Sequence, residues 1–507
     1  MKTKNKILLL FLAAFVFVGT LTVRAVSVGS ETGSDGVSKN VTDTATLTIT
    51  NVNAGDQFAA YLILDAFYNE SSNVISYEFS DDFQAFIDQS DDYSTYTVDQ
   101  YQKLTGGDIS SGSAASSSEL DKLASAYAAY IKDNSTAGTP MSTSGTTATA
   151  TLEAGAYLVL PTQTQRVYAV MVGNLDFTAA GNNWTINNEE INAKVSDAAI
   201  EKGVGDSAVD SGSYKVGDVV PYVITGTVPT WPTNSTNRVY TIKDTVTAGL
   251  DFQAVDSIKI SVGGTPLTNS NGTFTNTGSE TVATAQIQDK TLTITFVGEK
   301  ISGTTVKVEY GAKINSNAVV GGTGNKNSAS LVYSNDPYGD GTYTSDPASG
   351  GGDEATVFLY GIEIFKHKAG EPGTALEGAT FEIHKDSAEG EVVATVTTES
   401  DGYIKTGGLA EGIYYVEETK APAGYQLLTD PLMVKIGPNQ DGEEALEDTN
   451  SDGYYELDIA NTEVGLLPVT GSIGTIILTV VGLIVVGGAI YFFVVYKKKK
   501  QNEQQNA

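Results

Sequence analysis

The chain has 507 residues, no cysteine, two histidines and a formal net charge of −31 at pH 7. Such an acidic chain is not expected to bind nucleic acid or an anionic membrane through its charge. The lack of cysteine excludes disulfides, thiol catalysis and thiolate metal sites, and two histidines leave little for a Ser-His-Asp triad or a multi-histidine metal site. We therefore expect a protein that is not an enzyme and needs no cofactor or metal.

The chain begins with the features of a secretory signal peptide. Three lysines among the first six residues precede an apolar run at 7–18 that is too short to span a membrane comfortably. Val23 and Ala25 then place small residues at positions −3 and −1 of a cleavage site. We predict that residues 1–25 are removed and that the rest of the chain is exported.

Residues 27–196 combine strand and helix patterns. Alternating segments such as 46–50 and 156–160 are typical of strands with one buried face. Between them, the pattern predicts one helix, with Ser118 as its N-cap. The apolar face of this helix would consist of Leu120, Leu123, Tyr127 and Ile131.

The rest of the exported body carries strand patterns only. Residues 197–335 contain short alternating segments separated by Gly, Asn and Pro turns, which is the pattern of an antiparallel sandwich. Residues 336–354 are rich in Gly, Asp, Ser and Pro, so we expect a linker. Residues 355–463 again alternate between strands and turns. The expected fold class is mainly β, with tandem antiparallel sandwiches after an N-terminal domain that has some helix.

Three elements close the chain: a pentapeptide at 467–471, an apolar run at 473–496 and a basic tail at 497–507. The apolar run has about 24 uncharged residues, enough at ~1.5 Å per residue to cross a hydrocarbon core of ~30 Å. The four lysines after it favour the cytoplasmic side, so the run predicts a transmembrane helix with the body outside. The pentapeptide consists of Leu467, Pro468, Val469, Thr470 and Gly471.

In the C-terminal part, three predicted strands each carry one polar residue on the face that is otherwise apolar. Because side chains alternate along a strand, Lys366, Glu418 and Asn461 each lie on the apolar face of their own predicted strand. Burial shifts the pKa of a lone ammonium or carboxylate toward its neutral form. A neutral amine can attack an asparagine amide polarised by a protonated carboxyl group, which releases ammonia and leaves a Lys–Asn isopeptide bond. From the pattern alone, an inward Lys–Glu ion pair beside a hydrogen-bonded asparagine is an equal alternative.

Two motifs favour the isopeptide bond. Residues 414–425 read YYVEETKAPAGY and resemble the E-box of Gram-positive pilins, Y-x-L-x-E-T-x-A-P-x-G-Y. Residues 376–381 resemble the L-x-G-A-x-F strand of the CnaB-type domains that carry this motif. The E-box glutamate of those domains catalyses an intramolecular Lys–Asn bond. The resemblance therefore assigns Glu418 as catalyst and Lys366 and Asn461 as the bonded pair.

Residues 197–335 resemble the middle domain of backbone pilins in four segments: 200–204, 216–222, 240–246 and 327–335. That domain carries a similar bond with an acidic catalyst. The resemblance implies a bond between Lys202 and Asn327, with Asp244 as catalyst. Asn335 shares a strand face with Asn327 and stays an alternative, although the family's terminal strand, N-x-A-x-L, favours Asn327.

The end of the chain resembles Gram-positive surface proteins that a sortase processes at LPxTG. In that family the enzyme cuts between the positions of Thr470 and Gly471 and passes the threonine carbonyl to an amine. Backbone pilins supply this amine from a lysine near the junction of their first two domains, and Lys194 occupies this place. The usual Tyr-Pro-Lys is absent here, because Asn-Ala precedes the lysine. Weaker candidates away from the junction are Lys39, Lys103, Lys122 and Lys132.

One string resembles the start of a calcium loop. Asp448, Asn450 and Asp452 precede Gly453 as in an EF-hand, but the twelfth position is Ile459 instead of glutamate. A hairpin turn explains the same residues, so no metal site is expected.

Taken together, the motifs resemble those of a backbone subunit of a sortase-assembled pilus on a Gram-positive cell wall. The resemblance implies tandem Ig-like sandwiches of CnaA and CnaB type and single-turnover self-crosslinking in place of enzymatic turnover. The implied partners are sortase, neighbouring copies of the chain, peptidoglycan, ancillary pilins and a host ligand. The alternative is a monomeric wall-anchored adhesin or tip pilin that binds a host ligand.

Overall fold

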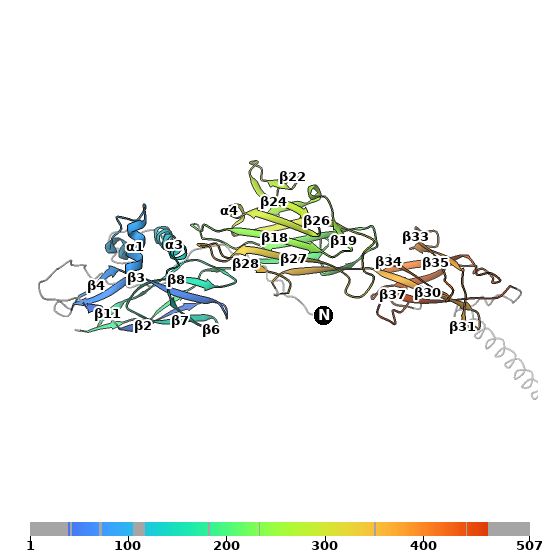
Figure 1. Ribbon diagram of the computed structural model, residues 1–507, viewed down its shortest axis with the longest axis horizontal. Helices are drawn as coiled ribbons and strands as arrows, with labels where there is room; N and C mark the ends of the chain where they lie inside the picture. Colours follow the sequence, from blue (N-terminus) through green and yellow to red (C-terminus); the bar gives the residue numbers. More distant parts are fainter. Residues whose placement is uncertain are drawn as a thin grey trace, which may run out of the picture.

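The computed structural model describes residues 39–40, 43–69, 74–104, 117–180, 183–232, 234–348, 351–442 and 444–464. The predicted signal peptide, pentapeptide, transmembrane run and basic tail lie outside these residues. Within the described part, no helix is long and apolar enough to cross a membrane. Figure 1 shows three β-rich bodies that follow one another in chain order along the long axis.

The N-terminal domain contains a six-stranded sheet, a four-stranded sheet and three helices. Its helices are α1 (Asp81–Gln89), α2 (Val98–Leu104) and α3 (Ser117–Asn134). Its strands are β1 (Lys39–Asn40), β2 (Thr44–Thr50), β3 (Gln57–Asn69), β4 (Val74–Phe79), β5 (Thr139–Pro140), β6 (Ser142–Ser144), β7 (Thr147–Glu153), β8 (Gly155–Gln163), β9 (Val167–Tyr168), β10 (Met171–Leu175), β11 (Phe177–Ala180), β12 (Asn183–Ile186), β13 (Glu189–Asn192) and β14 (Val195–Ser196). The larger sheet has the order β1-β3-β8-β10, and the smaller has the order β13-β2-β7-β6.

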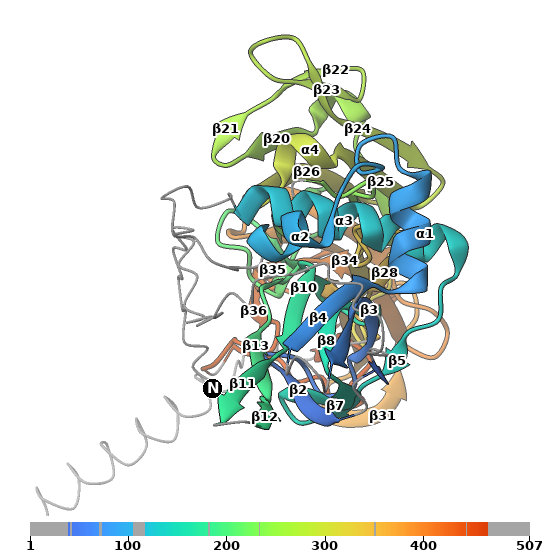
Figure 2. The same ribbon diagram turned by 90° about the vertical axis from the view of Figure 1, so that its left-hand side faces the viewer.

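Strand β8 separates two cores because its side chains alternate. Leu158 and Leu160 pack with Tyr127 of α3 on one face. Tyr157 and Val159 pack on the other face against the smaller sheet. The predicted helix is confirmed as α3, and Figure 2 shows it together with α1 and α2 on one side of the domain. The sequence patterns did not predict α1 and α2.

The middle domain is a sandwich of a six-stranded and a nine-stranded sheet. The smaller sheet contains β15 (Ala199–Val204), β17 (Val219–Thr227), β26 (Thr305–Ile314), β20 (Lys259–Val262), β21 (Thr265–Pro266) and β19 (Leu250–Phe252). The larger contains β16 (Ser211–Ser213), β29 (Asp353–Phe358), β27 (Asn325–Ser334), β18 (Val239–Val246), β25 (Thr291–Val297), β24 (Thr281–Gln288), β23 (Thr273–Thr275), β22 (Thr268–Ser270) and β28 (Thr342–Ser345). A short helix, α4 (Gly298–Ile301), and a 3₁₀ turn at Val255–Ser257 complete the domain.

The C-terminal domain is a sandwich of two four-stranded sheets. One contains β31 (Glu371–Ala375), β30 (Tyr360–Lys368), β34 (Tyr403–Leu409) and β37 (Tyr454–Asn461). The other has the order β33 (Val392–Thr397), β32 (Thr380–Lys385), β35 (Gly412–Lys420) and β36 (Leu432–Ile436). The side chains between them form one apolar core that includes Ile362, Phe381 and Val416.

The structure differs from the expected boundaries at residues 336–354. This segment holds β28 and the start of β29, and both strands pair with β27 in the middle sandwich. Tyr338 is only 5% exposed and packs in the core beneath the helices of the N-terminal domain. The composition of the segment did not indicate these strands, because backbone hydrogen bonds between strands do not require apolar side chains.

Among the described residues, three pairs of strands are parallel, and two of these pairs lie in the sandwiches that were expected to be antiparallel. They join β2 to β13, β16 to β29, and β30 to β37. A period of two in the sequence is the same for both directions, so the pattern could not distinguish them.

Candidate crosslinking sites

Lys366, Glu418 and Asn461 meet in the core of the C-terminal sandwich. Lys366 lies on β30 and Asn461 on its parallel neighbour β37, whereas Glu418 comes from β35 in the facing sheet. Their exposed fractions are 0%, 2% and 1%. The strand alternation read from the sequence therefore brings the three predicted side chains to one buried point.

The contacts among these three groups suit an aminolysis reaction. The Lys366 Nζ donates to the Asn461 Oδ1 and lies 3.2 Å from the Glu418 Oε1. The Asn461 Nδ2 donates to both carboxylate oxygens of Glu418, at 2.8 and 2.9 Å. The backbone N–H of Leu428 donates to the Glu418 Oε2 at 2.9 Å and helps to hold the carboxylate in place.

Burial makes the Lys366 amine a better nucleophile. Desolvation lowers the pKa of Lys366 to about 8, although the charge of Glu418 acts in the opposite direction. A larger fraction of the amine is thus neutral near physiological pH than in water. In this geometry the amine can add to the Asn461 Cγ, the Glu418 carboxyl can transfer protons, and the Nδ2 can leave as ammonia.

Lys202, Asp244 and Asn327 form a second buried cluster, in the middle sandwich. Lys202 lies on β15 in one sheet, and Asp244 and Asn327 lie on the neighbouring strands β18 and β27 of the other. Their exposed fractions are 2%, 0% and 0%. The Lys202 Nζ lies 2.5 Å from the Asp244 Oδ1. Burial lowers the pKa of Lys202, and Asp244 opposes the shift.

Tyr310 of β26 connects this cluster, and sequence reasoning missed it. Its hydroxyl accepts hydrogen bonds from the Lys202 Nζ and, at 3.1 Å, from the Asn327 Nδ2, and it donates to the Asp244 Oδ2. Burial and the charge of Asp244 raise the pKa of Tyr310 well above its usual value, so the hydroxyl stays protonated. Within the described residues, the buried Asn327 Oδ1 has no hydrogen-bond partner. The alternation of β26 could have placed Tyr310 in the core, but gave no sign of its contacts.

The alternative asparagine, Asn335, lies elsewhere. Its Nδ2 donates to the backbone carbonyl of Thr164 in the N-terminal domain at 2.5 Å. Of the two asparagines, only Asn327 shares a hydrogen-bonded network with Lys202 among the contacts of the described residues.

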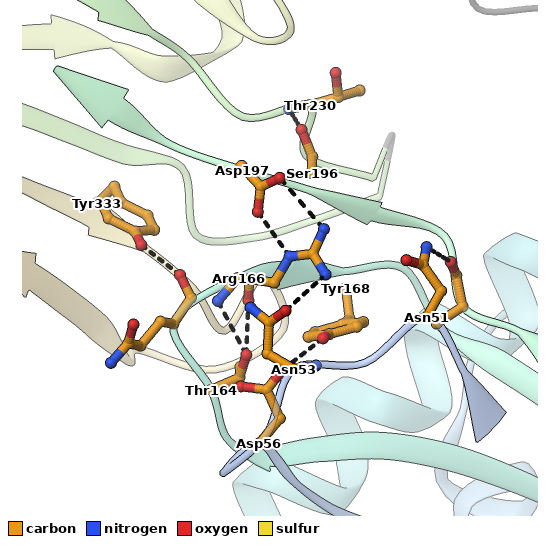
Figure 3. A network of polar contacts seen from close by, with 12 residues as sticks. Asn51, Asn53, Asp56, Thr164, Arg166, Tyr168, Ser196, Asp197, Thr230 and Tyr333 are labelled. Atoms are coloured by element: carbon orange, nitrogen blue, oxygen red, sulfur yellow. Dashed lines mark hydrogen bonds and ion pairs between the residues drawn. The ribbon is translucent and has the colours of Figure 1, made fainter. Parts of the chain in front are cut away.

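Lys194 lies at the junction of the N-terminal and middle domains, between β13 and β14. Its side chain is exposed, and its positive charge acts on Asp121 of α3. The polar contacts of this junction are drawn in Figure 3. The Arg166 guanidinium lies 2.6 Å from the Asp197 carboxylate, and the Tyr333 hydroxyl donates to the backbone carbonyl of Gln165. These contacts join the two domains, and one of them involves Asp197, three residues after Lys194.

The other lysines differ in their surroundings. Lys122 is exposed on α3, whereas the Lys132 Nζ lies 2.8 Å from the Asp336 Oδ2. The side chains of Lys39 and Lys103 lie outside the described part of the structure.

The calcium-like string at 448–453 forms a turn before β37. The Asp448 carboxylate accepts from the backbone N–H groups of Asp452 and Gly453 at 3.0 and 2.8 Å. The Asp452 carboxylate lies 2.9 Å from the Lys405 Nζ. These bonds give the acidic residues a structural role in the turn.

Two segments of the chain match known protein families. Residues 362–452 match the SpaA family, described as a prealbumin-like fold domain, and residues 460–503 match the LPXTG cell wall anchor motif. These matches confirm the expected surface location. The class of protein is a wall-anchored surface protein of Gram-positive bacteria with a β-sandwich next to its anchor.

Individual relatives make the class more specific. Over 344 residues the chain is 24% identical to the trypsin-resistant surface T6 protein of Streptococcus pyogenes serotype M6, a match that covers 54% of this chain and 63% of that protein. The structure of the T6 backbone pilin of the same serotype, described as modular and three-domain, superposes with a TM-score of 0.65 and 20% identity over 83% of this chain and 99% of that one. The major pilin SpaD of Corynebacterium diphtheriae gives a TM-score of 0.49 and 19% identity over 84% and 98% of the two chains. The superposition on the T6 backbone pilin shows that the chain has the fold of a backbone pilin.

Proposed function

We propose that this chain is the repeating backbone subunit of a pilus, covalently joined outside the cell and reinforced by two self-formed Lys–Asn isopeptide bonds. In the polymer, sortase links the carbonyl of Thr470 to the Nζ of Lys194 in a neighbouring copy, and the last subunit is attached to peptidoglycan. The observation that carries the proposal is the pair of buried Lys–acid–Asn clusters in tandem sandwiches that precede a wall anchor.

The internal bonds connect Lys202 to Asn327, with Asp244 as catalyst, and Lys366 to Asn461, with Glu418 as catalyst. Each bond would replace an energetically costly buried ammonium by a neutral amide. The second bond closes a loop of 95 residues. In the chain-entropy model such a closure stabilises a domain by about 4–5 kcal/mol. A chain without cysteine would gain in this way the crosslinks that other exported proteins obtain from disulfides.

The position and exposure of Lys194 support its role as the acceptor. A nucleophile for an acyl-enzyme must approach a second protein, which a buried lysine cannot do. Lys194 meets this requirement and, unlike the exposed Lys122, lies at the junction of two domains. A polymer built through it would join the C-terminal end of one copy to the first junction of the next.

An immunoblot of cell-wall extract boiled in SDS tests this function. We expect the natural chain to give a ladder of high-mass species and Lys194→Ala to give exported monomer only. Lys122→Ala is the matched control, because it removes an exposed lysine nearby, and it should keep the ladder. A ladder that persists in Lys194→Ala and disappears when another lysine is changed would refute the acceptor assignment. Monomer alone from the natural chain would instead indicate a wall-anchored adhesin.

A further inference from the structure

Three side chains converge on the outer face of the C-terminal sandwich. Glu382 and His384 lie two residues apart on β32, and Glu417 lies on β35 directly opposite Glu382 in the register of the two strands. The ligand-capable atoms of the three residues all lie within 4.8 Å of one another. Because Ile383 and Glu418 face the core, this cluster is on the side of the sheet opposite the crosslink.

His384 is held with one ring nitrogen free to act as a ligand. Its Nδ1 lies 3.2 Å from the backbone carbonyl of Gly390, which can only accept a hydrogen bond, so Nδ1 carries the proton. In the neutral imidazole the Nε2 then carries a lone pair, and within the described residues it has no hydrogen-bond partner. The His384 side chain is only 9% exposed, so this nitrogen lacks easy access to water.

The unpartnered nitrogen is directed at two carboxylates. The His384 Nε2 lies 3.4 Å from the Glu417 Oε2 and 3.9 Å from the Glu382 Oε2. Two ligand atoms on a tetrahedral ion with bonds of about 2.1 Å lie roughly 3.4 Å apart. A cation between the three atoms would satisfy the buried nitrogen and reduce the repulsion between the two carboxylates.

We propose that Glu382, His384 and Glu417 bind one divalent transition-metal ion, for which Zn²⁺ is the appropriate probe. A neutral imidazole with two carboxylates suits Zn²⁺ better than Ca²⁺, which takes oxygen ligands. The carbonyl of Gly390 on Nδ1 provides the outer contact that commonly orients a histidine ligand. The side chains of Glu382 and Glu417 are 36% and 44% exposed, so the ion can enter from solvent and keep water as a further ligand.

A metal ion bound by these residues would link β32 to β35. Strand β35 carries Glu417 on its outer side and Glu418 on its core side. An ion on the outside and an isopeptide bond inside would hold the same strand from both faces. The metal site does not depend on the proposed crosslinks, so either can fail in experiment without the other.

Calorimetric titration of purified protein spanning residues 27–466 with Zn²⁺ tests the proposal. We expect one ion per chain and at least about tenfold weaker binding in both His384→Gln and Glu417→Gln. His367→Gln is the matched control, because His367 is the only other histidine in the chain, and it should bind as the natural chain does.

Thermal unfolding in the presence of Zn²⁺ provides an independent measurement. A bound ion should raise the unfolding temperature of the natural chain and of His367→Gln, but not of Glu417→Gln. Should His384→Gln fail to fold, Glu417→Gln still decides the matter, because Glu417 is on the solvent side of its strand. Absence of binding to the natural chain, or equal binding by Glu417→Gln, would overturn the proposal. His384 would then be an ordinary partner of two carboxylates.

Discussion

Burial of a lysine in an apolar core destabilises its charged ammonium form. The same effect increases the fraction of neutral amine, which is the reactive form. Lys366 and Lys202 share this condition but differ in how they meet their asparagines. The Lys366 Nζ contacts the Asn461 amide directly, whereas Lys202 reaches Asn327 through the hydroxyl of Tyr310. We infer that the two bonds have different proton-transfer requirements.

Tyr310→Phe tests this difference. The substitution keeps the ring but removes the hydroxyl that contacts Lys202, Asp244 and Asn327. We expect the bond of the middle domain to form at least about tenfold more slowly, since a positioned proton donor and acceptor is lost. The bond of the C-terminal domain should form as usual. The measurement is the time course of ammonia loss by mass spectrometry as denatured, uncrosslinked chain refolds.

Tyr240→Phe is the matched control for this experiment. Tyr240 is also buried in the same core, but its hydroxyl donates to the backbone carbonyl of Thr227 at 3.3 Å. The Tyr240→Phe variant should form both isopeptide bonds at the rate of the natural chain. Equal rates for Tyr310→Phe and the natural chain would show that Tyr310 is a packing residue only.

The pH dependence of bond formation follows from the pKa of Lys366. Burial lowers that pKa from 10.5 to about 8, so the amine is largely neutral above pH 8 and protonated below it. If Glu418 reacts as the carboxylate that accepts both hydrogen bonds from Asn461, the rate of the Lys366–Asn461 bond during refolding should fall about tenfold for each pH unit below 8 and level off above it. A rate that rises on acidification would contradict the neutral amine as the reacting form, and a rate that is flat from pH 6 to 8 would show that the amine reacts together with a protonated Glu418.

At the scale of the element, adjacent residues of a strand face opposite sides of the sheet, so two neighbouring glutamates of β35 have different surroundings. Glu418 faces the core of the C-terminal sandwich at 2% exposure, whereas the side chain of Glu417 is 44% exposed on the other face of β35. The register of β35 therefore separates a proposed catalyst from a proposed metal ligand.

Glu418→Ala should leave the apolar strands able to fold but prevent the Lys366–Asn461 bond. The variant should retain one ammonia, about 17 Da, in its intact mass. Without the loop closure it should become sensitive to protease and unfold at least several degrees (~5 °C) lower. Glu417→Gln is the control on the same strand and should keep both bonds. If Glu418→Ala keeps both bonds as well, Glu418 is structural here.

How much of this arrangement the sequence could predict depended on the element. The alternation of side chains predicted that Lys366, Glu418 and Asn461 face inward. Their contact with one another depends on how the strands pack. Tyr310 could not be distinguished from an ordinary core tyrosine, because its role lies in contacts with three other strands. His384 and Glu417 showed no relation in the sequence, since only the pairing of β32 with β35 brings them together.

At the scale of the whole molecule, three domains follow one another along the long axis (Figure 1). The junction between the first two is reinforced by Tyr338, which follows the middle-domain strand β27 and packs in the N-terminal core. This interlocking was not evident from composition, which suggested a linker at 336–354. The lifetime of a fibre under tension depends on the rate at which its domains unfold. Covalent bonds between the strands of a domain would slow this unfolding.

The most direct test of the two internal bonds is the intact mass of purified protein spanning residues 27–466. Each Lys–Asn condensation releases one ammonia, so the natural chain should weigh about 34 Da less than its sequence. Asp244→Ala and Glu418→Ala should each recover about 17 Da of this difference, after correction for the substitution itself. A natural chain with the full mass of its sequence would contradict the account and leave Lys202 and Lys366 as buried ion-pair partners.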